Sequence, residues 1–141
     1  MKPNPSLWCF ALALLFLTSC QSLRERRELR SIYIEEFKLT YFETLLQKAF
    51  HHPEFQKATA SDRSHFSEPI LTESSRALIA QYTTLHAAQI QQDSIQSIGH
   101  RAEGSQGKRV WAFALKQYKS KWLEGLARSE GEKFCRLNRT N

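Results

Sequence analysis

Histidine is the residue type that most readily binds a metal ion or moves a proton near neutral pH. The chain has five histidines, which are His51, His52, His65, His86 and His100. No two of them are four residues apart, the spacing that places two zinc ligands on one face of a helix. The first three could join Asp62 in a metal site only if the tertiary structure brought them together. We therefore expect solvated loop histidines and no metal ligand.

A serine or cysteine nucleophile needs a neighbouring base and a group that orients that base. The sequence has Ser64-His65 and Ser67-Glu68 as neighbours in one polar loop, and it lacks the Gly-x-Ser-x-Gly turn of serine hydrolases. The paired carboxylates Glu35-Glu36 fit the polar face of an amphipathic helix better than an acid-base pair. We therefore predict no catalytic residue and no cofactor, which favours a binding protein over an enzyme.

Three of the five glycines lie in residues 99–107, which read GHRAEGSQG. A phosphate-binding loop would follow a strand and end in Gly-Lys-Ser or Gly-Lys-Thr, whereas Gly107 is followed by Lys108 and Arg109. The composition instead predicts a flexible connection between two helices. A charged loop on a rigid helical body is a common way to present a recognition surface.

Residues 1–19 have the pattern of a secretory signal peptide. Lys2 is their only charge, an apolar run follows from Leu7 to Leu17, and small or polar residues come next. The run is too short for a retained transmembrane helix, which needs about 17–25 residues. We therefore expect an exported protein.

The end of this segment, Leu17-Thr18-Ser19-Cys20, resembles the lipobox of bacterial lipoproteins. In that family the cysteine thiol receives a diacylglycerol, the peptide bond before it is cut, and the new amine is usually acylated as well. The resemblance implies lipidation of Cys20, which would attach the mature chain to a membrane. Gln21, rather than Asp, follows Cys20, as in lipoproteins that many Gram-negative bacteria send to the outer membrane, where they face the periplasm.

The mature chain is basic at both ends. Its net charge is +5, from 20 lysines and arginines less Lys2, against 14 acidic residues. Residues 20–30 are expected to be a basic tether that merges into the first helix, where the arginines either rest on anionic headgroups or are simply solvated. Export and the lack of a basic-aromatic motif argue against a nucleic-acid partner. Cys135 would be the one remaining thiol, so no internal disulfide can form.

Apolar residues at spacings of three and four predict an all-α fold, a small bundle of three long helices plus one or two short ones. The long helices are expected over 25–50, 73–98 and 108–127. Pro53 could begin a short helix over 53–58, since proline is well suited to a first helical turn. The sequence has no convincing strand and no hairpin turn.

The helical domain is expected over 31–128, and residues 129–141 lack periodicity, which indicates a frayed C-terminal tail. Thr72 is suited to cap the second long helix. The residues of that helix predicted to face inward are Leu78, Ile79, Tyr82, Leu85, Ala88 and Ile95. Trp111 and Trp122 are eleven residues apart, about three helical turns, so we predict that both belong to the core.

In the order of its segments, the range 33–128 resembles the helical immunity proteins that neutralise type VI secretion amidase effectors. The strongest match is 113–126 (FALKQYKSKWLEGL). That family's last helix has a Tyr, a Ser-Lys step and then Leu-Asp/Glu-x-Leu, which match Tyr118, Ser120, Lys121, Leu123, Glu124 and Leu126. The segment 41–50 matches the family's first helix, with Ala49-Phe50 where an Ala-aromatic pair is usual.

The chain departs from the family at two positions. Many relatives have a cysteine in the first helix and one in the last, bridged across the core, and the aligned residues here are Leu45 and Ala114. An apolar contact could replace the bridge, because helical spacing also turns both positions inward.

The resemblance implies inhibition of a peptidoglycan-cutting cysteine amidase by binding. Family members act in the periplasm, often as homodimers, and insert a loop into the amidase cleft. Here that loop would be 99–107, with Gly99, His100, Arg101, Glu103, Gly104 and Gly107 as partner contacts. The alternative is a small structural or assembly lipoprotein of the envelope without inhibitor activity, which docks on a larger complex through the polar second half of helix 73–98.

Overall fold

The computed structural model describes residues 5–62, 64–66, 69–96 and 109–138, with side chains except those of 5–23, Ala60 and Gln96. The described chain is all-α, as predicted, and no strand occurs in it. Three helices are long and two are short. They are α1 (Pro5–Phe50), α2 (Pro53–Ala60), α3 (Glu73–Gln96), α4 (Val110–Tyr118) and α5 (Lys121–Leu137).

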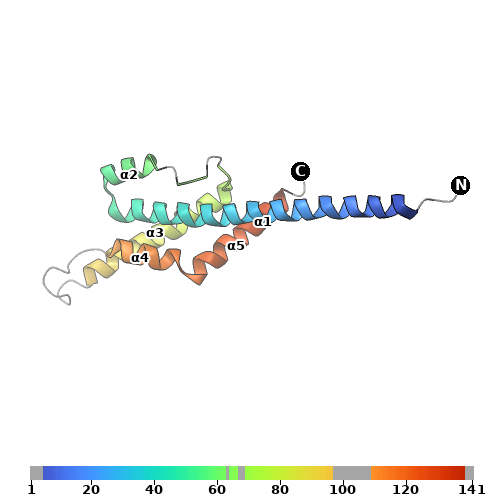
Figure 1. Ribbon diagram of the computed structural model, residues 1–141. Helices are drawn as coiled ribbons and strands as arrows, with labels where there is room; N and C mark the ends of the chain where they lie inside the picture. Colours follow the sequence, from blue (N-terminus) through green and yellow to red (C-terminus); the bar gives the residue numbers. More distant parts are fainter. Residues whose placement is uncertain (1–4, 63, 67–68, 97–108, 139–141) are drawn as a thin grey trace.

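The helix α1 is the axis on which the other helices pack (Figure 1). α3 runs parallel to it, because Tyr33 and Tyr41 of α1 contact Ser75 and His86 of α3 in the same order. α4 and α5 return antiparallel to α1. Their contacts therefore run in reverse order, with Lys38 beside Glu124 and Arg30 beside Glu132.

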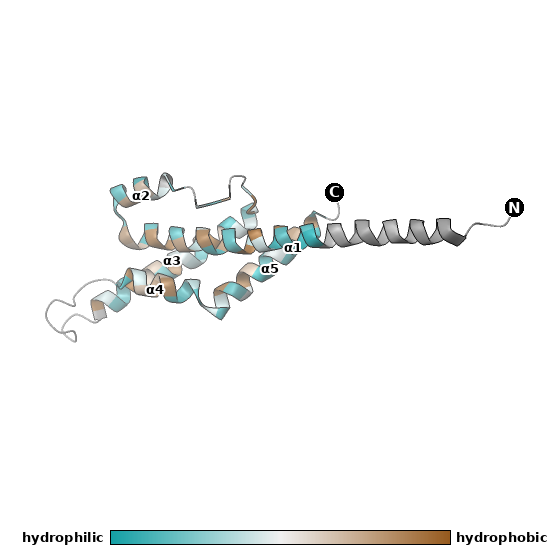
Figure 2. Ribbon diagram, viewed as in Figure 1, coloured by the Kyte–Doolittle hydropathy of each residue, from teal (hydrophilic) through white to brown (hydrophobic). Residues whose placement is uncertain are grey.

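The core follows one face of α1. Tyr33, Phe37, Tyr41 and Leu45 are four residues apart in turn, and all four are fully buried. Burying one large apolar side chain stabilises the fold by about 1.5–3 kcal/mol, so this row alone supplies a substantial share of the packing. Hydrophilic and hydrophobic residues alternate around this part of α1 (Figure 2). The predicted inward positions Leu45 and Ala114 are both fully buried.

Thr72 caps α3, as predicted, because its Oγ1 accepts a hydrogen bond from the backbone N–H of Ser75 at 3.2 Å. The inward face of α3 differs from the prediction. Ile79 is buried, but Leu85 and Ile95 are 57% and 59% exposed. Ala88 is exposed as well, whereas Ile90 is buried.

Two buried hydroxyl residues explain this difference. Ser75 and Thr83 lie on the same face as Ile79 and are fully buried, so the buried face is partly polar. Ser75 hydrogen-bonds to Tyr33, and the Thr83 Oγ1 donates to the carbonyl of Ile79 at 2.7 Å. Because satisfied hydroxyls can be buried at little cost, apolar residues alone predicted only part of this face, including Leu78 and Tyr82, which pack partly buried against the core.

The predicted single helix 108–127 is divided in two. α4 ends at Tyr118, and the Ser120 Oγ accepts from the backbone N–H of Leu123 at 3.1 Å, which caps the start of α5. The two tryptophans therefore lie on different helices. Trp111 and Trp122 are 52% and 40% exposed, so the prediction that both belong to the core is wrong.

Most of the predicted frayed tail is ordered helix. α5 continues to Leu137, and it buries Ala127, Glu130 and Gly131 against the bundle. The ring of Phe134 stacks on Tyr33 with centroids 4.6 Å apart. These residues recur every three or four positions, but Glu130 and Gly131 interrupt the apolar pattern and concealed it. The tail prediction is wrong up to residue 137, and residues 139–141 lie outside the described chain.

Candidate functional site

Cys20 lies within α1, whose backbone is helical from Pro5 to Phe50. The predicted basic tether, 20–30, is therefore part of the same helix that forms the core. At 1.5 Å per residue, about 20 Å of helix separates Cys20 from Tyr33, the first fully buried residue among the described side chains of α1. In the described ranges, no helix is long and apolar enough to cross a membrane.

The predicted partner contacts lie outside the described residues. They are Gly99, His100, Arg101, Glu103, Gly104 and Gly107. The structure does describe the two ends to which this segment is joined, which are the end of α3 and the start of α4. In Figure 1 both lie at the left, beside the end of α1, whereas the N-terminal end of α1 lies at the far right.

Aromatic residues gather where α4 begins. The exposed ring of Trp111 lies 6.0 Å from Phe50, 6.2 Å from Phe42 and 6.5 Å from Phe55, measured between ring centroids. We call these four residues the Trp111 cluster. Exposed Leu115 follows Trp111 one turn later. Exposed aromatic groups of this kind are enriched at the centres of protein interfaces.

A second cluster joins the loop after α2 to α1. The His65 Nδ1 lies 2.7 Å from the Glu36 Oε1, and the His65 Nε2 lies 2.5 Å from the Glu43 Oε2. Glu36 also accepts from the backbone N–H of Phe66 at 2.9 Å, and Glu43 accepts from Gln47. The prediction of a solvated loop histidine is wrong for His65.

The protonation state of His65 follows from this geometry. Burial by itself would lower its pKa, but hydrogen bonds and the negative charges of Glu36 and Glu43 outweigh burial and raise it. With both ring nitrogens facing carboxylates, the imidazolium form donates two hydrogen bonds. Neither nitrogen is then available as a base for the adjacent Ser64. The cluster is therefore suited to holding the loop on α1.

A third cluster connects α1 with α3. Burial lowers the pKa of His86 and raises that of Tyr41, so both groups remain neutral near pH 7, and the Tyr41 hydroxyl is hydrogen-bonded to the His86 Nδ1. The ring of Trp122 packs edge-on against His86, Tyr41 and Tyr82, at 5.4, 6.0 and 5.0 Å between centroids. This arrangement covers the hydroxyl-imidazole pair with apolar surface.

A fourth cluster closes the other end of the bundle. The Tyr33 hydroxyl lies 2.8 Å from the Ser75 Oγ, which donates to the Glu130 Oε2 at 2.7 Å. Burial would raise the pKa of Glu130, but hydrogen bonds from Lys133 and Ser75 outweigh burial and lower it. A buried carboxylate thus ties α5 to α3. The sequence gives no sign of it, because Ser75 and Glu130 are 55 residues apart.

No group of three or more potential ligand side chains among the described residues could hold a metal ion. His51 and His52 are exposed in the connection between α1 and α2. No family model, curated protein or solved structure matches the chain.

Proposed function

We propose that this protein is a lipid-anchored binding protein of the bacterial cell envelope. The observation that carries the proposal is Leu17-Thr18-Ser19-Cys20 within α1, the helix that continues into the core. Cleavage before Cys20 and acylation of its thiol would leave the mature helix attached to the outer membrane, facing the periplasm. About 20 Å of helix would separate the lipid from Tyr33, where the buried core row of α1 begins.

The specific activity that we propose is inhibition of a peptidoglycan amidase effector, with residues 99–107 occupying the amidase cleft. The resemblance of 33–128 to amidase immunity proteins supports it, as does the burial of Leu45 and Ala114, where relatives carry a bridge. The ends that carry this segment lie remote from the anchored end of α1 (Figure 1). The Trp111 cluster beside the start of α4 would add apolar contact area.

The anchor is tested by membrane fractionation of the full chain and its Cys20→Ala variant. After a high-salt wash, we expect the parent protein to remain in the membrane fraction. We expect the Cys20→Ala variant to carry no lipid. Cys135→Ala is the matched control, because it removes the other mature thiol without touching the lipobox. Unchanged lipidation or membrane retention of the Cys20→Ala protein would contradict the proposal.

The inhibitor activity is tested in cells that export a candidate amidase, beginning with any amidase encoded beside this gene. Co-expression of the full chain should prevent lysis, and the two proteins should co-purify. The double variant His100→Ala/Arg101→Ala should lose protection, whereas Arg76→Ala, exposed at the start of α3, should keep it. If no amidase of the host or its competitors binds the protein, the specific proposal fails.

Exposed Leu85 and Ile95 favour a second candidate, a structural or assembly lipoprotein that docks through α3. Two exposed aliphatic side chains on one helix are suited to packing against a larger partner. If this candidate is correct, the parent protein should crosslink to envelope proteins and the double variant Leu85→Glu/Ile95→Glu should not. Neither protein should then protect cells from an amidase. Protection that survives this double variant would favour the inhibitor instead.

A further inference from the structure

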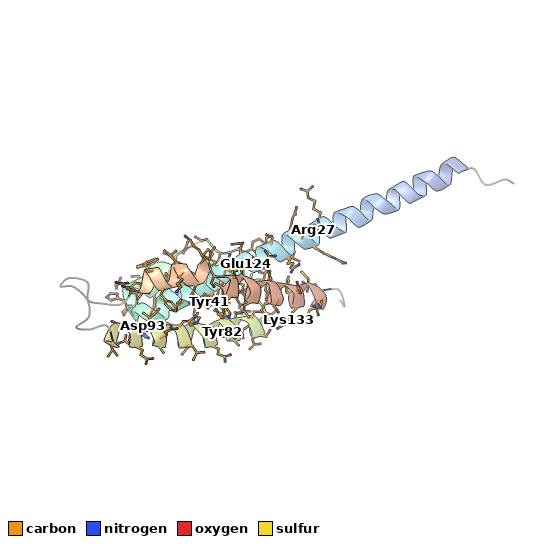
Figure 3. All side chains as sticks on the ribbon, turned by 90° about the horizontal axis from the view of Figure 1, so that it is seen from below. Arg27, Tyr41, Tyr82, Asp93, Glu124 and Lys133 are labelled. Carbon is orange, nitrogen blue, oxygen red and sulfur yellow. The ribbon has the colours of Figure 1, made fainter. Side chains whose placement is uncertain are left out.

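The two basic ends of the sequence meet at one end of the bundle. The Arg30 Nη2 lies 2.5 Å from the Glu132 Oε1, and a Cβ on Gly131 would lie 3.5 Å from Ile34. The last turns of α5 are thereby held beside Arg30 and Ile34 of α1. Figure 3 labels Arg27 and Lys133 at this end and Asp93 at the other.

The positive charge of the mature chain is concentrated here. Residues 24–30 and 128–138 together contain seven arginines and lysines against four glutamates, a net charge of +3. The range 31–127 contains eleven basic against ten acidic residues, a net charge of only +1. The excess of positive charge thus lies on the side of the domain nearest to Cys20.

Part of this charge is neutralised internally and part is not. Arg24 pairs with Glu28 at 3.0 Å, and Lys133 pairs with Glu130 at 2.5 Å. Arg136 is mostly exposed and lies 3.8 Å from Glu132, which already pairs with Arg30. Arg26 and Arg27 are exposed and form no ion pair within the described residues. Glu25 is the one acidic residue between Cys20 and Arg26.

We propose that Arg26, Arg27 and Arg136 form a membrane-docking surface that binds anionic phospholipid headgroups. The inference rests on the proposed lipid on Cys20. Arg26 and Arg27 lie about 9–10 Å along the helix from Cys20, the residue that would carry the lipid. This distance is about one Debye length at 0.1 M salt, so the arginines feel the surface potential of the membrane.

The function of this surface is orientation. Acyl chains on Cys20 supply most of the membrane affinity, while each arginine near an anionic surface adds only about fivefold to a binding constant. Contacts from both α1 and α5, however, restrict the tilt of the bundle on its anchor. The end of α3 and the start of α4 are then directed away from the membrane, where a periplasmic partner can reach them.

Cys135 provides a native probe, because it is half-buried near the end of α5 and is the free thiol of the described domain. The lipidated full-length mature protein is reconstituted in vesicles of neutral phosphatidylcholine or of phosphatidylcholine with phosphatidylglycerol. Flotation and the mass of the lipidated peptide first establish the anchor. Alkylation of Cys135 by an uncharged, impermeant maleimide is then timed in both vesicles.

We expect alkylation to be several-fold slower in the anionic vesicles, and high salt to remove the difference. Arg26→Gln/Arg27→Gln/Arg136→Gln should also remove it. The matched control Lys116→Gln/Lys119→Gln/Lys121→Gln deletes three exposed charges on α4, on α5 and in the connection between them, and it should keep the difference.

Equal rates of Cys135 alkylation in the two kinds of vesicle would overturn the docking surface. The same result would follow if the triple arginine variant were still alkylated more slowly in the anionic vesicles. Protection by inorganic phosphate without vesicles would overturn it in favour of a simple anion site. Failure of flotation would instead reject the lipid anchor, so the two proposals fail by different observations.

Discussion

Replacing His65 by glutamine tests whether one imidazolium holds the loop after α2 on the bundle. The parent histidine makes two charge-assisted hydrogen bonds, to Glu36 and Glu43. Such a bond contributes roughly 1.5–3 kcal/mol when shielded from water. The His65 side chain is 26% exposed and glutamine keeps one bond, so we expect a net loss of about 1–2 kcal/mol near pH 6.

The pH dependence separates charge from packing. Because the pKa of His65 is raised in the folded state, its stabilisation is complete below the unfolded value of about 6.5. The stabilisation is lost as the pH rises through the higher folded pKa. The stability difference between the parent and His65→Gln should therefore shrink between pH 6 and pH 9.

The assay is equilibrium urea unfolding of the purified chain, followed by circular dichroism at pH 6 and pH 9. His52→Gln is the matched control, because His52 is exposed and makes no side-chain cap hydrogen bond. The control should unfold like the parent at both pH values. If His65→Gln loses the same unfolding free energy at both pH values, the charge of His65 does not stabilise the fold and only its packing contributes.

Three further predictions concern stability. Gly125→Ala should stabilise the fold by about 0.5–1 kcal/mol in urea unfolding, because an added Cβ meets nothing within 4 Å and helical glycine costs entropy; destabilisation would contradict the packing of α5. Glu130→Ala should cost about 2–3 kcal/mol by removing a buried acceptor of Ser75, and Glu130→Gln should cost less; equal losses would refute a role for that hydrogen bond. His86 has a lowered pKa, so stability should fall below pH about 6.5, where the unfolded state binds the proton. In thermal melting measured at several pH values, His86→Gln should reduce this loss of stability at low pH, and an unchanged loss would contradict the prediction.

The helical periodicity of the sequence was sufficient for the fold class and for the inward position of Leu45. Leu45 belongs to a row of large apolar residues at a spacing of four, a pattern that tertiary context seldom overrides. The cap at Thr72 was readable for a similar reason, since a threonine directly precedes an amphipathic run. These features depend on residues that are close in the sequence.

The errors arose where distant residues decide the structure. Ser120 is recognisable as a helix cap only once it is known that α4 ends at Tyr118. Buried Glu130 is acceptable only because Ser75, 55 residues away, donates to it. His65 likewise depends on two glutamates of α1 that the sequence places 29 and 22 residues before it.

Cys20 is the reverse case, because the signal for its proposed lipidation lies wholly in local sequence. The structure adds that the helix containing it continues without a break into the core. A lipid at this position would therefore act on a rigid extension of the domain. This makes the orientation of the bundle at the membrane a property that can be measured.

We propose that Cys20 is the lipidated first residue of the mature protein. Mass spectrometry of the N-terminal peptide from membrane-extracted protein tests it most directly. We predict a peptide that begins at Cys20 and carries a diacylglycerol on sulfur and a further acyl chain on the amine. A mature protein with unmodified Cys20, or with an N-terminus at another residue, would contradict the proposed anchor.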